Sequence, residues 1–433
     1  MRRDITSLMA GKGCQFSDRR NGVIRMTNTQ PVVLTSTAGQ RDLPRWFSAG
    51  FSVLQGLRAG SIAIRLPDGR VFRVEGPEPG PQAQLHVRNP ALFSRIAREG
   101  ELGFCEAYLD GWWDSPDLQV FLDVLLSSSD WVDRSHPGAR LMQAYQRFSH
   151  WLNRNSKNQA RKNISHHYDL GNAFYERWLD QTMTYSSALF ADPSEELTEA
   201  QRRKYESIFD RIDARPDGHI LEIGCGWGGF AEYAAGERGA RVTGLTISRE
   251  QHEFASRRVF EAGLSDRVSI QMRDYRDERG SYDGIASIEM FEAVGEKYWP
   301  SYFGAMRDRL KPGAQAAIQV ITVTDAAFPT YRKTVDFIQK YIFPGGMLPS
   351  PSALRDQINR AGLRQVASLE FGESYSETLR RWHVDFNAAW SDIQAMGFDD
   401  RFRRMWNFYL TSCAAAFRTG TTDVAQVTIQ RPA

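Results

Sequence analysis

The chain has 433 residues, of which 42% are hydrophobic and 24% charged, so it is long enough for two or three domains that each bury a core. No stretch reaches the about eighteen uninterrupted apolar residues that a membrane-spanning helix needs, and the first thirty residues contain no apolar run of signal-peptide length. We therefore expect a globular protein of the cytoplasm with no nucleic-acid partner. Its four cysteines are scattered without the spacing of a metal site or a disulfide framework.

The N-terminal part of the chain divides into a leader and a small domain. Residues 1–45 are polar and lack periodicity, so we interpret them as a mobile leader. Residues 46–130 are expected to form an α+β domain. The runs Ser61–Leu66 and Val71–Val74 flank a Pro-Asp-Gly turn and predict a hairpin, and helical patterns follow at Pro90–Arg98 and Leu118–Leu126.

Residues 131–165 form a predicted basic linker. The segment from Arg134 to Tyr168 contains no Asp or Glu but seven basic residues, namely Arg134, Arg140, Arg147, Arg154, Lys157, Arg161 and Lys162. Aromatic and aliphatic residues are interleaved with them, as in an amphipathic helix that lies on an anionic membrane. This pattern predicts peripheral association with membranes. A solvated interdomain linker is the alternative.

Residues 166–433 form the predicted second domain, in which helices and strands alternate at the spacing of βαβ units from about Glu195 on. This alternation favours an α/β fold with a mostly parallel sheet covered by helices on both faces. Helices are expected at Phe230–Glu237 and Arg249–Ala262. The predicted strands are His219–Ile223, Arg241–Leu245, Val268–Met272, Tyr282–Ser287 and Gln315–Val320.

The segment Glu222–Phe230 is typical of a nucleotide site, because a strand leads into a glycine-rich turn and then into a helix. Its pattern is G-x-G-x-G-G rather than the dinucleotide pattern G-x-G-x-x-G. The next strand ends in Leu245-Thr246, without the acidic residue that grips the ribose of NAD. The pattern therefore argues against a dinucleotide.

Several separated blocks, all in one order, resemble the cyclopropane fatty acid synthases and their relatives, the mycolic acid cyclopropanating and methylating enzymes. The resemblance covers nearly everything from about residue 55 on. It implies a Rossmann-like methyltransferase domain, the cofactor S-adenosylmethionine, and unsaturated phospholipids at a membrane surface as substrates. A homodimer stays open. The blocks are Gly103–Trp113, His167–Asn172, Glu222–Gly229, Leu245–Ser248, Met290–Glu292, Tyr341–Gly346 and Leu348–Ser350.

The resemblance also assigns the cofactor-binding residues one by one. It places a lid over the cofactor at Tyr168, Tyr185 and Ser186, and the methionine part against Glu222, Gly224 and Gly226. The ribose is expected near Thr246, Ile247 and Gln251, and the adenine near Asp274, Tyr275 and Arg276, with Trp227 as a packing surface. Ordinary core packing is the alternative for Tyr168 and Trp227.

The implied reaction is the attack of a C=C bond on the sulfonium methyl, which leaves a carbocation. Such a site must be dry, and aromatic faces stabilise its positive charge. A base must then remove a proton, from the new methyl for a cyclopropane or from a neighbouring carbon for a methyl branch. In the cyclopropane synthases this base is a bound bicarbonate, and the matching residues here are Glu292, Ile321 and Tyr375.

Two positions depart from this implied bicarbonate site. Ser187 stands for the family's cysteine, and Gln319 stands for its histidine. Both side chains can donate a hydrogen bond to an anion, but neither carries the positive charge of a histidine. Bicarbonate binding is therefore in doubt. We hypothesise a methyl-branched, unsaturated acyl product with Glu292 as the base; the alternative for Glu292 is a buried structural carboxylate.

Three other functions compete with this one. The first is a cyclopropane synthase that forms the ring. The second keeps the cofactor but methylates an amine, as do N-methyltransferases that resemble the same family. The third is a lipid-binding protein without catalysis, which the intact glycine turn argues against.

Overall fold

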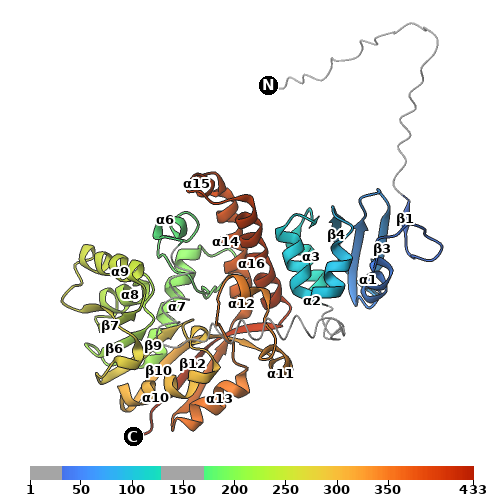
Figure 1. Cartoon of the computed structure of the whole chain (residues 1–433). Coiled ribbons are helices and arrows are strands. Elements are labelled where there is room, and N and C mark those ends of the chain that lie inside the picture. Colours follow the sequence, from blue (N-terminus) through green and yellow to red (C-terminus); the bar gives the residue numbers. More distant parts are fainter. Residues whose placement is uncertain (1–31, 128–169) are drawn as a thin grey trace, which may run out of the picture.

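The computed structural model describes residues 32–127 and 170–433, and Tyr168 and the predicted basic linker lie outside these ranges. The described chain forms one sheet of five strands and one of seven. Figure 1 shows the two sheets at opposite ends of the molecule, with long helices between them. In the described ranges, no helix combines the length and the apolar character needed to cross a bilayer.

The smaller sheet belongs to the N-terminal domain and has the strand order β1-β3-β2-β4-β5. The predicted hairpin is confirmed, since β2 and β3 pair antiparallel with Ile64 opposite Phe72. The predicted leader of residues 1–45 is too long, because Val33 and Leu34 pair with β3. The strands are β1 Val33–Leu34, β2 Ala59–Arg65, β3 Val71–Glu75, β4 Glu78–Val87 and β5 Trp113–Asp114.

Three helices complete this domain: α1 Phe47–Leu54, α2 Leu92–Leu109 and α3 Leu118–Leu126. The helix predicted at Pro90–Arg98 is only the first part of α2. The chain kinks at Gly100, whose φ of 65° and ψ of −141° are not helical, and the helix then continues to Leu109. Asp117 caps α3 by accepting a hydrogen bond from the Val120 N–H, as is typical of a helix N-terminus.

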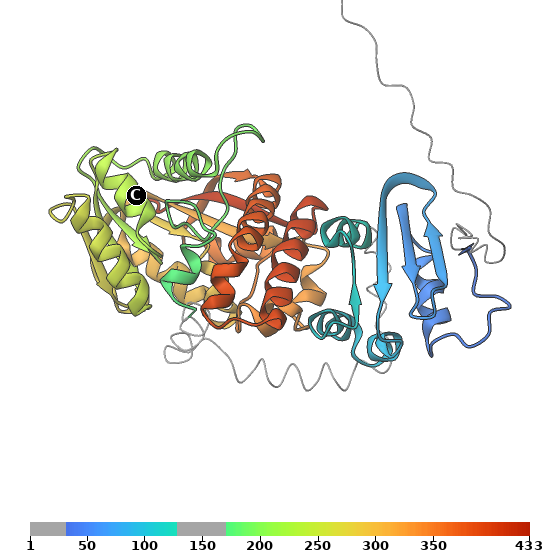
Figure 2. The same cartoon turned by 90° about the horizontal axis from the view of Figure 1, so that it is seen from above.

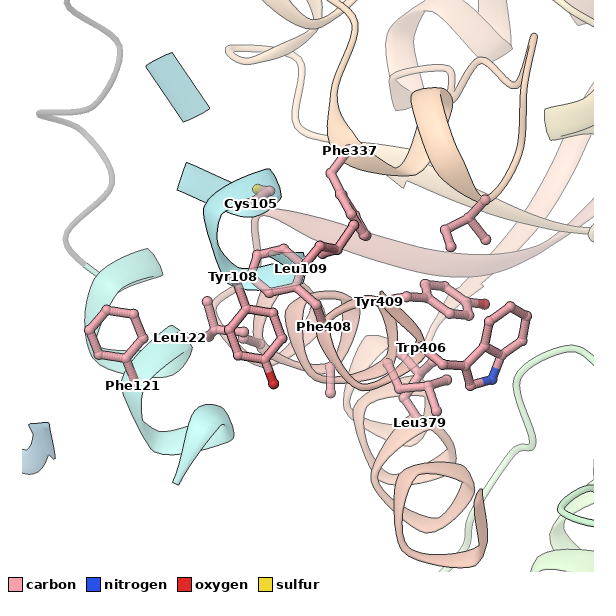
Figure 3. Close-up of a cluster of buried hydrophobic side chains, with 14 of the residues drawn as sticks. Cys105, Tyr108, Leu109, Phe121, Leu122, Phe337, Leu379, Trp406, Phe408 and Tyr409 are labelled. Atoms are coloured by element: carbon pink, nitrogen blue, oxygen red, sulfur yellow. The ribbon is translucent and has the colours of Figure 1, made fainter. Parts of the chain in front are cut away.

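Helices α2 and α3 pack against α16 (Asp400–Arg418) of the second domain, and Figure 2 shows the three helices side by side. In Figure 3, Tyr108 and Leu122 lie beside Phe408 of α16 in one buried cluster. The guanidinium of Arg404 lies 3.9 Å from the centroid of the Tyr108 ring and donates to the carbonyl oxygens of Tyr108 and Trp113. The two domains therefore share an apolar core, and the charge-assisted hydrogen bonds of Arg404 also join them.

The larger sheet has the strand order β11-β12-β10-β9-β6-β7-β8, and β12 runs in the opposite direction to the other six strands. The mostly parallel sheet is thus confirmed. The predicted strands lie within one residue of their observed ends, except for β10, which is longer. The strands are β6 His219–Ile223, β7 Arg241–Thr246, β8 Val268–Met272, β9 Tyr282–Ile288, β10 Leu310–Val323, β11 Arg364–Glu370 and β12 Thr422–Gln430.

Helices cover both faces of this sheet. One buried cluster joins α7 (Leu197–Ile212), α8 (Gly229–Gly236) and α9 (Arg249–Glu261) to it, and another joins α10 (Trp299–Arg309) and α13 (Pro351–Arg360). The other α-helices in the described ranges are α6 Asn172–Tyr175, α11 Phe328–Tyr331, α12 Phe337–Tyr341, α14 Gly372–Ala388 and α15 Trp390–Ala395. Short 3₁₀ turns follow β8 and β9 at Tyr275–Asp277, Phe291–Ala293 and Glu296–Tyr298.

A close approach between β9 and α7 generates a stability prediction. A Cβ added at Gly284 lies 2.0 Å from Cγ2 of Ile212, so Gly284→Ala is expected to destabilise the fold by about 1–3 kcal/mol through overpacking. The control is Gly304→Ala in α10, where an added Cβ meets nothing within 4 Å. This control is expected to be neutral or to stabilise by up to about 1 kcal/mol. Urea unfolding measures both, and equal stabilities of the two variants contradict the prediction.

Candidate active site

The glycine-rich turn connects β6 to α8 and favours glycine at three of its positions. Gly224, Gly226 and Gly228 have φ values of +83°, +51° and +84°, a region that residues with a Cβ rarely adopt. The N–H groups of Gly224 and Cys225 both donate to the carbonyl oxygen of Leu245, at 3.0 and 2.9 Å. These bonds fix the turn against the end of β7. A Cβ built at Gly226 meets no atom within 4 Å, so the turn leaves open space for a ligand.

The residues predicted near the ribose follow β7. The hydroxyl of Thr246 donates to Oε1 of Gln251 at 2.9 Å and accepts from the N–H of Ser248. Ser248 in turn caps α9. Ile247 lies between them and lines the same cavity as Thr246 and Gln251. The helix start is therefore held rigidly beside the glycine turn.

The residues predicted near the adenine follow β8. Asp274 is almost fully buried, and both of its oxygens accept hydrogen bonds from the guanidinium of Arg276. The guanidinium also lies near the ring of Tyr275. All three line the cavity.

Of the three residues predicted as a lid, Tyr168 lies outside the described residues. The hydroxyl of Tyr185 lies 2.7 Å from that of Tyr409, and the hydroxyl of Ser186 accepts a hydrogen bond from Nζ of Lys204 at 2.7 Å. Trp227 is 4% exposed, donates to Oδ1 of Asn172, and also lines the cavity.

All of these parts of the site border a single cavity of about 1430 Å³. Its lining includes every described residue of the predicted cofactor site, together with Glu292 and Tyr375. Ser187 and Gln319 are buried behind this lining. The cavity continues to apolar side chains of α2, α3 and α16, among them Leu102, Phe104, Leu122, Leu125, Phe408 and Phe417.

Glu289 lies at the centre of the predicted anion site, although it was not among the residues predicted from the sequence. Its Oε1 accepts hydrogen bonds from the N–H of Ser187 at 2.8 Å and from Nε2 of Gln319 at 2.7 Å. Its Oε2 accepts one from the hydroxyl of Tyr375 at 2.6 Å. Ser187 thus contributes its backbone N–H and not its hydroxyl, which donates to the carbonyl oxygen of Ala188. The structure brings together three of the predicted catalytic residues, but around a carboxylate that was not predicted.

One signal in the sequence pointed to Glu289. The residue comes directly after the buried strand β9, and polar groups at the carboxyl ends of parallel strands commonly form the binding crevice of such folds.

Glu292 has a different environment from Glu289. Its Oε1 accepts from the N–H of Ile321 at 2.6 Å, whereas its buried Oε2 has no hydrogen-bond partner among the described residues. Burial, together with repulsion from Glu289, raises the pKa of Glu292 to about 8. Its carboxyl group is therefore mostly protonated at neutral pH. Burial likewise raises the pKa of Glu222 to about 8.

A buried lysine lies near this site. Lys204 of α7 is fully buried, and burial lowers its pKa while the negative charges of Glu289, Asp180 and Glu222 oppose that shift. Burial raises the pKa of Glu289, against the hydrogen bonds from Tyr375 and Gln319 and the charge of Lys204. Of Glu222, Glu289 and Glu292, Glu289 therefore has the most groups that favour its ionised form.

Comparison with known proteins places the chain in a family. The family model for mycolic acid cyclopropane synthetase matches residues 155–427. The chain is 43% identical to the tuberculostearic acid methyltransferase UfaA1 of Mycobacterium tuberculosis, over 86% of this chain and 89% of that protein. It is 36% identical to the cyclopropane-fatty-acyl-phospholipid synthase of Escherichia coli K12, over 81% and 88%.

A solved structure supports the cofactor. The mycolic acid cyclopropane synthase CmaA1, in complex with S-adenosylhomocysteine (SAH) and CTAB, matches with a TM-score of 0.59 and 28% identity. The match covers 62% of this chain and 98% of that one. The open turn at Gly226 and the cavity around it fit the same cofactor. The chain therefore belongs to the mycolic acid cyclopropane synthetase family and is an S-adenosylmethionine-dependent methyltransferase.

Proposed function

We propose that the protein transfers a methyl group from S-adenosylmethionine to the double bond of an unsaturated phospholipid acyl chain, and that the product is methyl-branched and unsaturated. The main support for this proposal is the cavity. It runs without interruption from the glycine turn to the apolar side chains of α2, α3 and α16. Its volume of about 1430 Å³ exceeds the roughly 300–1,000 Å³ of an ordinary small-molecule pocket. An acyl chain can extend along the apolar part while its double bond lies near the cofactor turn.

The lining also suits a reaction that passes through a carbocation. S-adenosylmethionine supplies an electrophilic methyl group, and the alkene supplies the electron pair. Aromatic rings from several elements face the cavity, including Tyr185, Phe343, Tyr375 and Tyr409. Their π-faces stabilise positive charge where water is excluded.

The names of the two relatives correspond to the two possible products, the methyl branch and the ring. One is a tuberculostearic acid methyltransferase, and the other is a cyclopropane-fatty-acyl-phospholipid synthase. The departures at Ser187 and Gln319 from the synthase pattern favour the branched product. An amine-methylating enzyme has no need of a long apolar extension of its cavity.

Isotope labelling distinguishes the products. The purified protein is incubated with vesicles of monounsaturated phosphatidylglycerol and S-adenosylmethionine that carries a trideuterated methyl group, and the acyl chains are analysed by mass spectrometry. A methyl branch keeps all three deuterium atoms, because the proton is lost from a neighbouring carbon. A cyclopropane keeps only two and resists ozonolysis. Finding the ring refutes the branched product, and finding no label in the acyl chains refutes the function.

The cofactor site is tested by a pair of glycine substitutions. Gly226 and Gly263 both have a positive φ, and an added Cβ meets nothing within 4 Å at either position. Only Gly226 lines the cavity. Gly226→Leu is expected to weaken the binding of SAH at least about tenfold, because its side chain fills the ligand's space. Gly263→Leu carries the same backbone strain and is expected to bind normally. Calorimetry of the folded variants measures both, and normal binding by Gly226→Leu contradicts this site.

We further propose that the basic segment from Arg134 to Lys162 attracts the protein to anionic lipid. The support is its sequence, since the segment contains seven basic residues and no Asp or Glu. Each basic residue near such a surface contributes on the order of 1 kcal/mol.

The triple substitution Lys157→Gln, Arg161→Gln and Lys162→Gln is therefore expected to weaken binding to anionic vesicles on the order of 100-fold at low salt. Sedimentation with vesicles measures the effect. The control replaces the exposed Arg249, Arg257 and Arg360 with Gln, which changes the net charge equally. Equal losses in the two triple variants argue against a role of this segment.

A further inference from the structure

We propose that Glu289 is the proton acceptor of the methyl transfer, and that its carboxylate takes the place of a bound bicarbonate. This inference rests on the proposed function. It assigns to Glu289 the role that the sequence pattern suggested for Glu292.

The first support is the set of hydrogen-bond donors around Glu289. The three donors come from the loop before α7, from β10 and from α14, at Ser187, Gln319 and Tyr375. These are positions that the family resemblance assigned to the bicarbonate site. The site is therefore a formed anion site that is filled by a side chain of the protein. The three donors occupy three of the about four lone-pair positions of a carboxylate, which leaves one for a proton.

The donors are themselves held in place. Oε1 of Gln319 accepts from Nε2 of Gln426 at 3.1 Å, so the amide of Gln319 presents its NH₂ group to Glu289. The N–H of Glu289 donates to the carbonyl oxygen of Gln319 at 2.8 Å, which ties the two residues together a second time. The ring of Tyr375 stacks on Phe417 with centroids 4.4 Å apart. Such fixed donors are typical of a preorganised catalytic site.

The second support is the backbone at Glu289. Its φ of +48° lies in the left-handed region, although the residue is not glycine. This conformation costs about 1–2 kcal/mol for a residue with a Cβ. Strain of this kind clusters at functional sites, where the surrounding structure over-determines it. Here the strained backbone directs a carboxylate into the cavity that also contains the cofactor turn.

The comparison with Glu292 favours Glu289. A general base must be ionised at the working pH. Glu289 has three donors, and the charge of Lys204 also favours its ionised form. Glu292 has one backbone donor for its Oε1 and none for its Oε2 in the described part of the chain. Burial raises the pKa of both carboxyl groups, but the surroundings of Glu289 oppose that shift more than those of Glu292 do.

The proposed step balances without a further reactant. The electron pair of the C=C bond forms the new carbon–methyl bond, and the S–CH₃ bond breaks with its electrons on sulfur. The adjacent carbon becomes a cation. The carboxylate of Glu289 accepts a proton from a neighbouring CH₂ group, and the C–H electrons form the new double bond. The proton leaves Glu289 for solvent when the products depart.

Two variants of Glu289 test the role. Glu289→Gln keeps the size of the side chain, and its amide oxygen can still accept from Ser187 and Gln319, but it cannot accept a proton. Glu289→Gly suits the positive φ and leaves space for a small anion beside the same donors. Both are assayed as the full chain with the deuterated cofactor and the phosphatidylglycerol vesicles, in buffer free of carbon dioxide and in buffer with added bicarbonate. The binding of SAH reports on folding.

The wild type is expected to turn over equally with and without bicarbonate. Both variants are expected to bind SAH normally and to lose at least about 100-fold in turnover. Added bicarbonate is expected to restore Glu289→Gly by on the order of tenfold or more, and to leave Glu289→Gln unchanged because its amide still fills the site. Glu292→Gln is expected to lose less turnover than Glu289→Gln and to show no response to bicarbonate.

Three results overturn the inference: a wild type that depends on bicarbonate, a Glu289→Gln variant within about threefold of the wild type, or a larger loss in Glu292→Gln than in Glu289→Gln. The wild-type reaction separates these from a failure of the proposed function. If the wild type places no label in the acyl chains, the function itself fails. If it does and Glu289→Gln does so equally well, only the role of Glu289 fails.

Discussion

A carboxylate in a largely apolar cavity must be neutralised locally, and much of the active-site region is organised around that constraint. Glu289 receives hydrogen bonds from Ser187, Gln319 and Tyr375, and Lys204 lies close enough to favour its charge. These groups come from a loop, β10, α14 and α7. An isolated ionised carboxylate in such surroundings would lose far more in desolvation than it gains from dispersion contacts. The packing of these four segments therefore places the groups that stabilise the negative charge of Glu289.

The sheet order explains why this carboxylate lies beside the cofactor turn. In the order β10-β9-β6-β7, the carboxyl ends of four parallel strands meet at one edge. The glycine turn follows β6, Thr246 ends β7, and Glu289 follows β9. The N-terminal domain lines the apolar end of the cavity through α2 and α3, which pack on α16 as Figure 3 shows. The glycine turn, the carboxylate and the apolar side chains thus line one cavity, because the connection pattern places the strand ends together.

The sequence predicted the parallel strands well because each is a short apolar run bounded by turn residues. It did not predict β11 or β12. Strand β11 is largely exposed and lacks a buried stripe, and β12 follows a long helix rather than a βαβ crossover. The cofactor turn was predictable because its residues are contiguous. The donors around Glu289 were not predictable, because they lie 102, 30 and 86 positions away from it along the chain. Contacts of that separation follow from the folded topology and not from local spacing.

A base that is part of a side chain also limits which proton of the acyl chain can be removed. A diffusible anion must be bound from solution at an entropic cost, whereas Glu289 is present at a high effective concentration at all times. The fold maintains this by offsetting the strain of a positive φ with the three hydrogen bonds to the side chain. The three hydrogen bonds also fix the position of the carboxylate on one side of the cavity. The base can therefore contact only part of the bound acyl chain. A base with a fixed reach removes protons only from carbons that the bound acyl chain presents to it. The choice between ring and branch then depends on how the chain lies against Glu289, and not on the supply of a second reactant.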